Sequence, residues 1–102
     1  MRKLESSEEW DCFLALNGMK IAILTTDWCG VCKQLTKSID RAQLTIPIVQ
    51  ISSSTIPHFR SQRKINTYPT ACLFDSEKLV TQVATSKLEV ITELITSVTA
   101  EK

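Results

Sequence analysis

The spacing of apolar residues near the N-terminus predicts a first helix. Ser6 and Glu9 have the spacing of a capping box, in which each side chain satisfies a backbone N–H at the helix start. Trp10 and Phe13 then recur at helical spacing, which makes them core residues, and Gly18 is a typical helix stop. We therefore expect a helix that ends at Gly18.

The central part of the chain predicts a strand, a helix and a second strand. Residues 20–26, KIAILTT, are β-branched and continuously apolar at their centre, which is typical of a strand covered on both faces. From Cys32 the apolar residues follow a helical period that must stop before Pro47, and residues 48–51 form another short apolar run. A strand–helix–strand unit of this kind is almost always parallel and right-handed.

The C-terminal half predicts a further helix, a hairpin and a last helix. Pro57 fits the first turn of a helix, and residues 70–74 and 78–84 read as two strands joined by a short turn. Ser86 and Glu89 form a second capping box. One apolar stripe follows them: Leu88, Ile91, Leu94, Ile95 and Val98.

Composition adds that these elements belong to one α/β domain spanning residues 1–102. The chain has 102 residues, of which 43% are hydrophobic and 23% charged, enough for one core without metal or disulfide staples. Twelve basic and eleven acidic residues give a formal net charge of +1 without long runs of one sign. We therefore expect neither nucleic acid nor a membrane surface as a partner, and a monomer is the expected state.

The N-terminal region predicts a cytoplasmic location. Acidic residues such as Glu5 and Glu8 stand where the apolar core of a signal peptide would be needed, and the apolar run 19–24 is too short to span a bilayer. Four cysteines would permit two disulfides, but permanent disulfides are rare in reducing compartments. A C-x-x-C pair in such a protein indicates redox or metal chemistry instead.

Residues 28–33, WCGVCK, place a C-x-x-C pair at the junction of the buried strand and the following helix. A thiolate at a helix N-terminus is stabilised by unpaired N–H groups and by the helix dipole, which favours Cys29 as the nucleophile. The spacing lets Cys32 attack a mixed disulfide on Cys29. Lys33 adds positive potential beside this pair, and Gly30 removes side-chain bulk.

The cysteines have two other interpretations, as ligands of a structural zinc ion or as small buried apolar residues. A structural zinc site needs four ligands, and the remaining donors Cys12, His58 and Cys72 are scattered singly along the chain. We interpret Cys12 and Cys72 as small buried apolar residues, and His58 as a solvent-facing side chain. Asp27 is an auxiliary candidate, either a proton relay or an exposed loop carboxylate.

The motif Trp28–Lys33 resembles the thioredoxin active site, with Val31 where that family usually has proline, and Ile65–Thr70, INTYPT, resembles the family's cis-proline segment. The resemblance extends over essentially the whole chain. It implies a thioredoxin fold with a central mixed sheet. The family's first strand is absent from the elements predicted above, so we expect about four strands flanked by about four helices.

The resemblance implies a thiol–disulfide oxidoreductase that reduces protein disulfides without a metal or organic cofactor. Cys29 would attack and Cys32 would resolve, and a flavoprotein thioredoxin reductase or another thiol donor would recharge the pair. Pro69 would be cis and face the dithiol, and Tyr68 would pair its backbone with an extended substrate segment. The implied substrate-binding residues are Trp28, Gly30, Val31, Tyr68 and Pro69.

Three departures from the family pattern accompany this resemblance. Ile23 stands where the family has a buried acid, and Ala84 and Thr85 occupy a stretch that usually contains glycine. Val31 frees a backbone N–H that proline lacks.

The alternative function is a binding module of the same fold, or a subunit of a larger enzyme, whose cysteines are dispensable. Residues 71–74, ACLF, in place of paired glycines, disfavour a glutaredoxin-type enzyme.

Overall fold

Strand β2 (Met19–Thr25) lies in the middle of the sheet, because its residues are apolar toward both faces. Every residue from Lys20 to Thr25 is buried. The structure is a computed structural model, and it describes residues 2–26, 30–54, 56, 59, 61 and 65–100, with the side chains of residues 98–100 excepted. The buried strand expected from the run KIAILTT is therefore confirmed.

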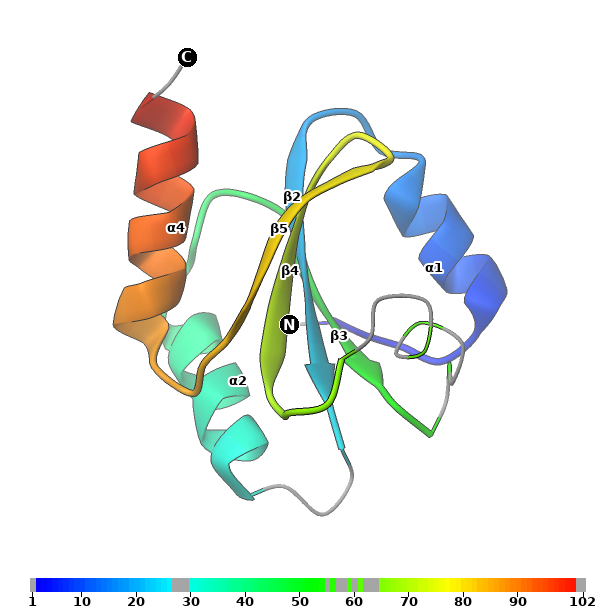
Figure 1. Cartoon of the computed structure of the whole chain (residues 1–102), viewed down its shortest axis with the longest axis horizontal. Coiled ribbons are helices and arrows are strands. Elements are labelled where there is room, and N and C mark those ends of the chain that lie inside the picture. The colour runs from blue at the N-terminus through cyan, green and yellow to red at the C-terminus, as the bar shows by residue number, and fades with distance from the viewer. Residues whose placement is uncertain are drawn as a thin grey trace.

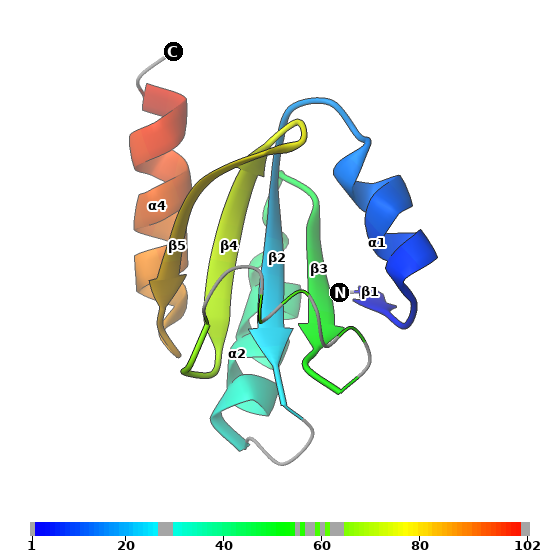
Figure 2. The ribbon, with the colours of Figure 1, turned by 45° about the vertical axis from the view of Figure 1, so that its right-hand side comes forward.

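The sheet has five strands in the order β1-β3-β2-β4-β5 (Figures 1 and 2), and Figure 2 shows them side by side. Strand β3 (Ile48–Ser52) is parallel to β2, as the strand–helix–strand pattern predicts. Strands β4 (Thr70–Asp75) and β5 (Lys78–Ala84) form an antiparallel hairpin, and β4 pairs antiparallel with β2. The result is the mixed sheet of an α/β protein, as expected.

The expectation that the first strand is missing is wrong. Strand β1 (Arg2–Leu4) pairs in parallel with β3 at the edge of the sheet, so the sheet has five strands and not four. Arg2 and Lys3 are exposed, whereas the side chain of Leu4 is fully buried. This strand escapes detection because one buried residue in a three-residue segment leaves no measurable periodicity.

The helices cover the two faces of the sheet. Helices α2 (Gly30–Ala42) and α4 (Leu88–Ala100) pack on one face, where their apolar residues join Ile21 and Ile23 of β2 in one cluster. Helix α1 (Ser7–Leu14) lies on the opposite face (Figure 2). These are the three α-helices within the described residues; the helix expected from Pro57 falls mostly outside them.

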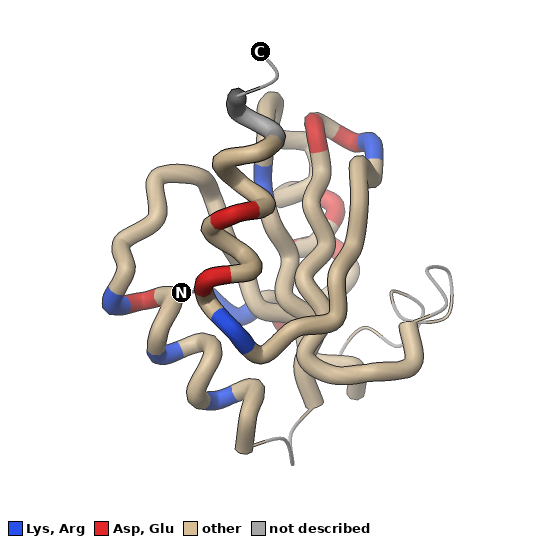
Figure 3. The backbone as a smooth tube through the Cα atoms, turned by 60° about the vertical axis from the view of Figure 1, so that its left-hand side comes forward, with Lys and Arg blue, Asp and Glu red and all other residues tan. Residues whose placement is uncertain are grey.

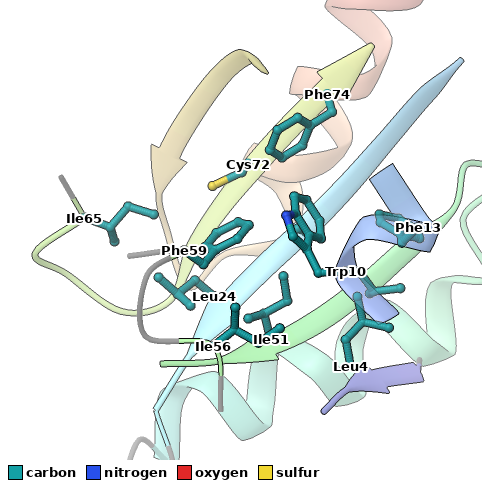
Figure 4. Packing of buried hydrophobic residues seen from close by; sticks show 12 residues of the cluster. Leu4, Trp10, Phe13, Leu24, Ile51, Ile56, Phe59, Ile65, Cys72 and Phe74 are labelled. Carbon is teal, nitrogen blue, oxygen red and sulfur yellow. The ribbon is translucent and has the colours of Figure 1, made fainter. Parts of the chain in front are cut away.

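The core on the α1 face is built around Trp10. The Trp10 ring meets the rings of Phe59 and Phe74 edge-on, with centroid distances of 4.9 and 5.2 Å, and lies 6.0 Å from Phe13 (Figure 4). Such edge-to-face pairs add to the free energy gained from apolar burial. The prediction that Trp10 and Phe13 are core residues is confirmed.

The start of α1 has one of the two hydrogen bonds of the predicted capping box, and the helix ends earlier than predicted. The Glu9 N–H donates to Ser6 Oγ at 3.1 Å, while Glu9 Oε1 accepts from the N–H of Glu5 rather than from that of Ser6. That hydrogen bond, together with Arg2, lowers the pKa of the Glu9 carboxyl. The helix ends at Leu14, and Gly18 is instead needed just before β2, where its φ is +93°.

The boundaries of the remaining elements agree with the sequence pattern. Helix α2 ends well before Pro47, and the next residue, Gln43, has a φ of +49°, the left-handed geometry common at helix ends. The β4–β5 turn is formed by Ser76 and Glu77, with Ser76 also left-handed. At the start of α4, the Lys87 N–H donates to the side chain of Thr85 at 3.0 Å, and the described hydrogen bonds do not include the capping box expected from Ser86 and Glu89.

Lys20 is an unusual member of β2, because its side chain is buried. Its ammonium group donates a hydrogen bond to the carbonyl oxygen of Leu16. Burial lowers the pKa of the Lys20 amine, and the negative charges of Glu77 and Asp75 offset part of this shift. A buried cation is therefore a cost to the folded state that depends on pH.

We expect Leu4→Ala to lower the free energy of unfolding by about 3 kcal/mol, because it removes a fully buried side chain and leaves a cavity. Urea unfolding at 25 °C measures the effect. The control is Leu16→Ala, at a side chain that is 49% exposed, for which we expect a change within about 0.5 kcal/mol. Equal effects of the two substitutions would contradict the pairing of β1 with β3.

We expect the stability of the wild type to rise with pH relative to that of Lys20→Met. The native pKa lies below the ordinary value of 10.5, so between the two values the unfolded chain binds more protons than the native chain. Stability must therefore increase with pH across that window. Urea unfolding of both proteins from pH 7 to pH 10 measures the difference. A difference that is constant with pH for Lys20→Met would contradict a lowered pKa.

Candidate functional site

The C-x-x-C motif lies where β2 passes into α2. Cys32 is in the first turn of α2, and its side chain is only 2% exposed. On the same face of this helix, Leu35 and Ile39 are buried against the sheet, which explains why Cys32 also points inward. Asp27, Trp28 and Cys29 lie outside the described residues, so the roles expected for them stay predictions.

The start of α2 supplies the electrostatic environment that thiol chemistry requires. The first turn of any helix presents unpaired N–H donors and the positive end of the dipole. Val31, in that turn, is 47% exposed, so an apolar side chain borders the motif on the solvent side. Lys33 is exposed as well, in agreement with a contribution of positive potential.

The second candidate segment adopts the geometry that the resemblance implies. The Tyr68–Pro69 peptide bond is cis, and Pro69 is buried. Two hydrogen bonds hold this segment in place: Thr70 Oγ1 donates to the carbonyl of Thr67 at 2.7 Å, and the Thr85 N–H donates to the carbonyl of Pro69 at 3.2 Å. The segment is therefore tied to the loop that precedes α4.

A groove joins these segments. It has a volume of about 370 Å³, and its lining residues are Val31, Thr67, Tyr68, Pro69, Ala84, Thr85 and Ser86. The structure thus brings Val31 together with Tyr68 and Pro69, which are far away in the sequence. Substrate binding by these three residues stays a prediction, but their common groove makes it geometrically possible.

Thr67 and Ser86 also line this groove. The sequence predicts Ser86 only as a helix cap and Thr67 only as part of the INTYPT segment, and it assigns neither residue to the site. Ala84 and Thr85 were recognised only as replacements for a glycine, and both side chains take part in the groove wall. The pairing of Thr70 with Ala84 across the β4–β5 hairpin places the loop before α4 beside the cis-proline. Only this register, which the sequence does not reveal, could have identified these residues.

Ile23 is fully buried and packs in the same apolar cluster as Leu35 of α2. No carboxylate is therefore present at this position beneath the helix that carries Cys32. The neighbouring polar contact is neutral: the side-chain amide of Gln50 donates to the hydroxyl of Thr25 at 3.0 Å. The acid that the resemblance leads one to expect at this position is therefore replaced by an apolar contact.

Gly30 does not occupy a crowded position. A Cβ atom added there would meet no described atom within 4 Å outside its own chain neighbours, so steric fit to the described part of the chain does not require glycine.

The two cysteines outside the motif differ in burial. Cys72 is fully buried in β4, as expected for a small apolar residue. The same expectation for Cys12 is wrong, because Cys12 is an exposed free thiol of α1. Position 12 lies off the face that Trp10 and Phe13 bury, which is the physical reason.

Two features are absent from the described residues. They contain no group of three or more His, Cys, Asp or Glu side chains that could hold a metal ion. His58 lies outside the described residues. None of the helices that the structure describes is both long and apolar enough to cross a bilayer.

Comparisons of sequence give a consistent result. The family model for thioredoxin matches residues 3–97. The thioredoxin of Chlamydia pneumoniae is 29% identical over 99 residues, which cover 93% of this chain and 96% of that protein. The thioredoxin of Chlamydia caviae is 30% identical over 86 residues, which cover 81% of this chain and 83% of that protein.

Comparisons of structure show the same fold. A thioredoxin from Plasmodium falciparum superposes with a TM-score of 0.86 at 17% identity, covering 95% of this chain and 98% of the other. A thioredoxin from Fasciola hepatica gives a TM-score of 0.83 at 14% identity, with the same coverage of both chains. At such identities the likeness concerns the fold alone.

We expect Thr70→Val to lower the free energy of unfolding by about 1 kcal/mol, because it removes the hydrogen bond to Thr67 while keeping the shape of the side chain. Urea unfolding measures the effect. The control is Thr92→Val in α4, where the lost hydrogen bond to the Glu89 carbonyl is exposed, and we expect a smaller effect. An effect of Thr70→Val no larger than that of the control would contradict a structural role of this bond in the cis-proline turn.

Proposed function

Because this chain belongs to the thioredoxin family, a family of thiol–disulfide oxidoreductases, we propose that it reduces protein disulfides by dithiol exchange. The observation that carries the proposal is the groove in which Val31, next to Cys32, meets the cis Tyr68–Pro69 segment. An extended substrate segment in this groove would lie beside the start of α2.

In the first step, the thiolate of Cys29 attacks one sulfur of the substrate disulfide. An S–S bond forms between Cys29 and that sulfur, and the other substrate sulfur leaves as a thiolate that takes a proton from water. The position of Cys29 immediately before α2 favours the thiolate, because helix N-termini stabilise negative charge.

In the second step, Cys32 loses its proton to solvent and attacks the sulfur of Cys29. The mixed disulfide breaks, the substrate leaves with both sulfurs reduced, and two electrons have passed from the dithiol to the substrate. The burial of Cys32 supports this order of events, since a buried thiol is less able to start the reaction with a large substrate. With Ile23 in place of an acid, we expect this step to limit the rate.

Sulfur exchange between protein side chains needs neither a metal nor an organic cofactor. A flavoprotein thioredoxin reductase, or another thiol donor, would reduce the Cys29–Cys32 disulfide again. We propose that the protein acts in the cytoplasm, where such donors keep thiols reduced.

We expect Cys29→Ser to abolish disulfide reduction and Cys32→Ser to trap the substrate in a mixed disulfide with Cys29. Mass spectrometry after mixing with a disulfide-bonded protein detects the trapped species, and turnover with dithiothreitol measures activity. All variants should be made in a Cys12→Ser background, because Cys12 is exposed and would form disulfides of its own.

The reduction potential gives an independent check. In the same Cys12→Ser background, we expect a reversible two-electron transition at or below the cytosolic poise, roughly −220 to −320 mV. Equilibration in thiol–disulfide buffers, followed by alkylation, measures it. If Cys29→Ser retains full activity, or if zinc copurifies with the thiols, the proposal is wrong and the binding module or the metal site gains support.

A further inference from the structure

A stripe of positive charge runs along α2, away from the motif. Lys33, Lys37 and Arg41 are all exposed and recur at every fourth position, so they lie along one side of the helix. We call these three residues the basic stripe. Figure 3 shows it as blue segments that follow one another along α2. It starts one residue after Cys32, which is the resolving thiol in the proposed reaction.

The charges of the basic stripe are available to a partner. In the part of the chain that the structure describes, none of the three cationic groups forms an ion pair. Asp40 is the acidic residue of α2, so three cations and one anion leave the helix with a net charge of +2. Positive charge without internal partners is what an interaction surface for an acidic partner requires.

The neighbouring helix carries the opposite charge. Helix α4 contacts α2 and contains Glu89 and Glu93 but no basic residue, so its net charge is −2. Red segments mark these residues in Figure 3. Because the two signs are separated onto two adjacent helices, an acidic partner would be attracted over α2 and repelled from α4. The separation of the two charges therefore affects both how strongly an acidic partner is attracted and the orientation in which it binds.

The groove between these features is uncharged. The residues that line it are apolar or carry hydroxyl groups, so the charges nearest to it in the described sequence are those of Lys33 and of Lys87, which follows the groove residue Ser86. Discrimination by charge therefore has to act on the parts of a substrate that extend beyond the groove. The basic stripe begins two positions after the groove residue Val31, so it lies on another side of α2 from the groove.

We propose that the basic stripe binds an acidic segment next to the disulfide of a protein substrate, and so selects disulfides that have carboxylates on one side. The spacing supports this class of partner. Successive stripe residues are about 6 Å apart along the helix axis. Alternate residues of an extended chain are about 7 Å apart, so carboxylates at alternate positions match the stripe. The inference rests on the proposed function, because it concerns the substrate of that reaction.

The test uses the full chain and three disulfide-containing peptides that share one central sequence. Their flanking residues are glutamates at alternate positions, glutamines or lysines. We expect the wild type to reduce the acidic peptide with a kcat/KM about tenfold higher than that of the basic peptide at about 10 mM salt, where charge steering is strong. At about 500 mM salt this preference should nearly disappear.

Two matched variants locate the effect. Lys37→Glu and Lys78→Glu both replace an exposed lysine and both change the net charge from +1 to −1, but Lys78 is in β5, outside the stripe. We expect Lys37→Glu to lower kcat/KM about fivefold for the acidic peptide and to leave the neutral peptide unchanged. We expect less than about a twofold change for Lys78→Glu. Circular dichroism and thermal unfolding of both variants show whether the fold is retained.

The outcomes separate this inference from the proposed function. If the wild type reduces all three peptides at equal rates, or if both variants have the same effect, the stripe does not select substrates although the enzyme is active. If the wild type reduces none of the peptides, the proposed function itself fails. A preference for the acidic peptide that is lost only in Lys37→Glu supports the stripe.

Discussion

The burial of β2 on both faces is the constraint on which the rest of the structure depends. Ile21 and Ile23 join the cluster beneath α2 and α4, whereas Ala22 and Leu24 join the cluster around Trp10. A strand of this kind has to be covered by a layer on each side. Helix α2, which follows the strand directly in the sequence, forms part of one of these layers. The chain reverses direction between β2 and α2, and the C-x-x-C motif lies in the sequence at this junction.

The elements with a strong apolar pattern could be predicted from the sequence. The buried strand, the helix that follows Cys32 and the parallel strand after it occur where the pattern places them. Strand β1 could not be predicted, because two of its three residues are charged and its existence depends on a pairing edge offered by β3. Local pattern carries no information about a partner that is more than forty residues away.

Cys12 shows a different kind of error. The expectation of burial came from the general behaviour of cysteine, while the helical spacing of Trp10 and Phe13 already defined which face of α1 is buried. Position 12 lies between them in sequence but on another side of the helix. The geometry of the element therefore outweighs the average preference of the residue type.

The candidate site was predictable only in part. Val31, Tyr68 and Pro69 were identified through resemblance, and the structure confirms that they share a groove. Nothing in the sequence assigns Thr67 or Ser86 to the site, and they line the groove only because of how the β4–β5 hairpin is placed. The sequence shows Ile23 as a departure from the family pattern, which has a buried acid at this position. The structure shows that Ile23 packs in one apolar cluster with Leu35 instead.

The contact between Gly18 and Ser76 has a consequence for the kinetics of folding. Two hydrogen bonds, Ser76 N–H to the Gly18 carbonyl at 2.9 Å and Gly18 N–H to Ser76 Oγ at 3.3 Å, join residues that are 58 positions apart. Closing so long a loop costs entropy before any contact compensates for it. The antiparallel pairing of β2 with β4 closes the same loop, so we expect the formation of this non-local contact to slow folding.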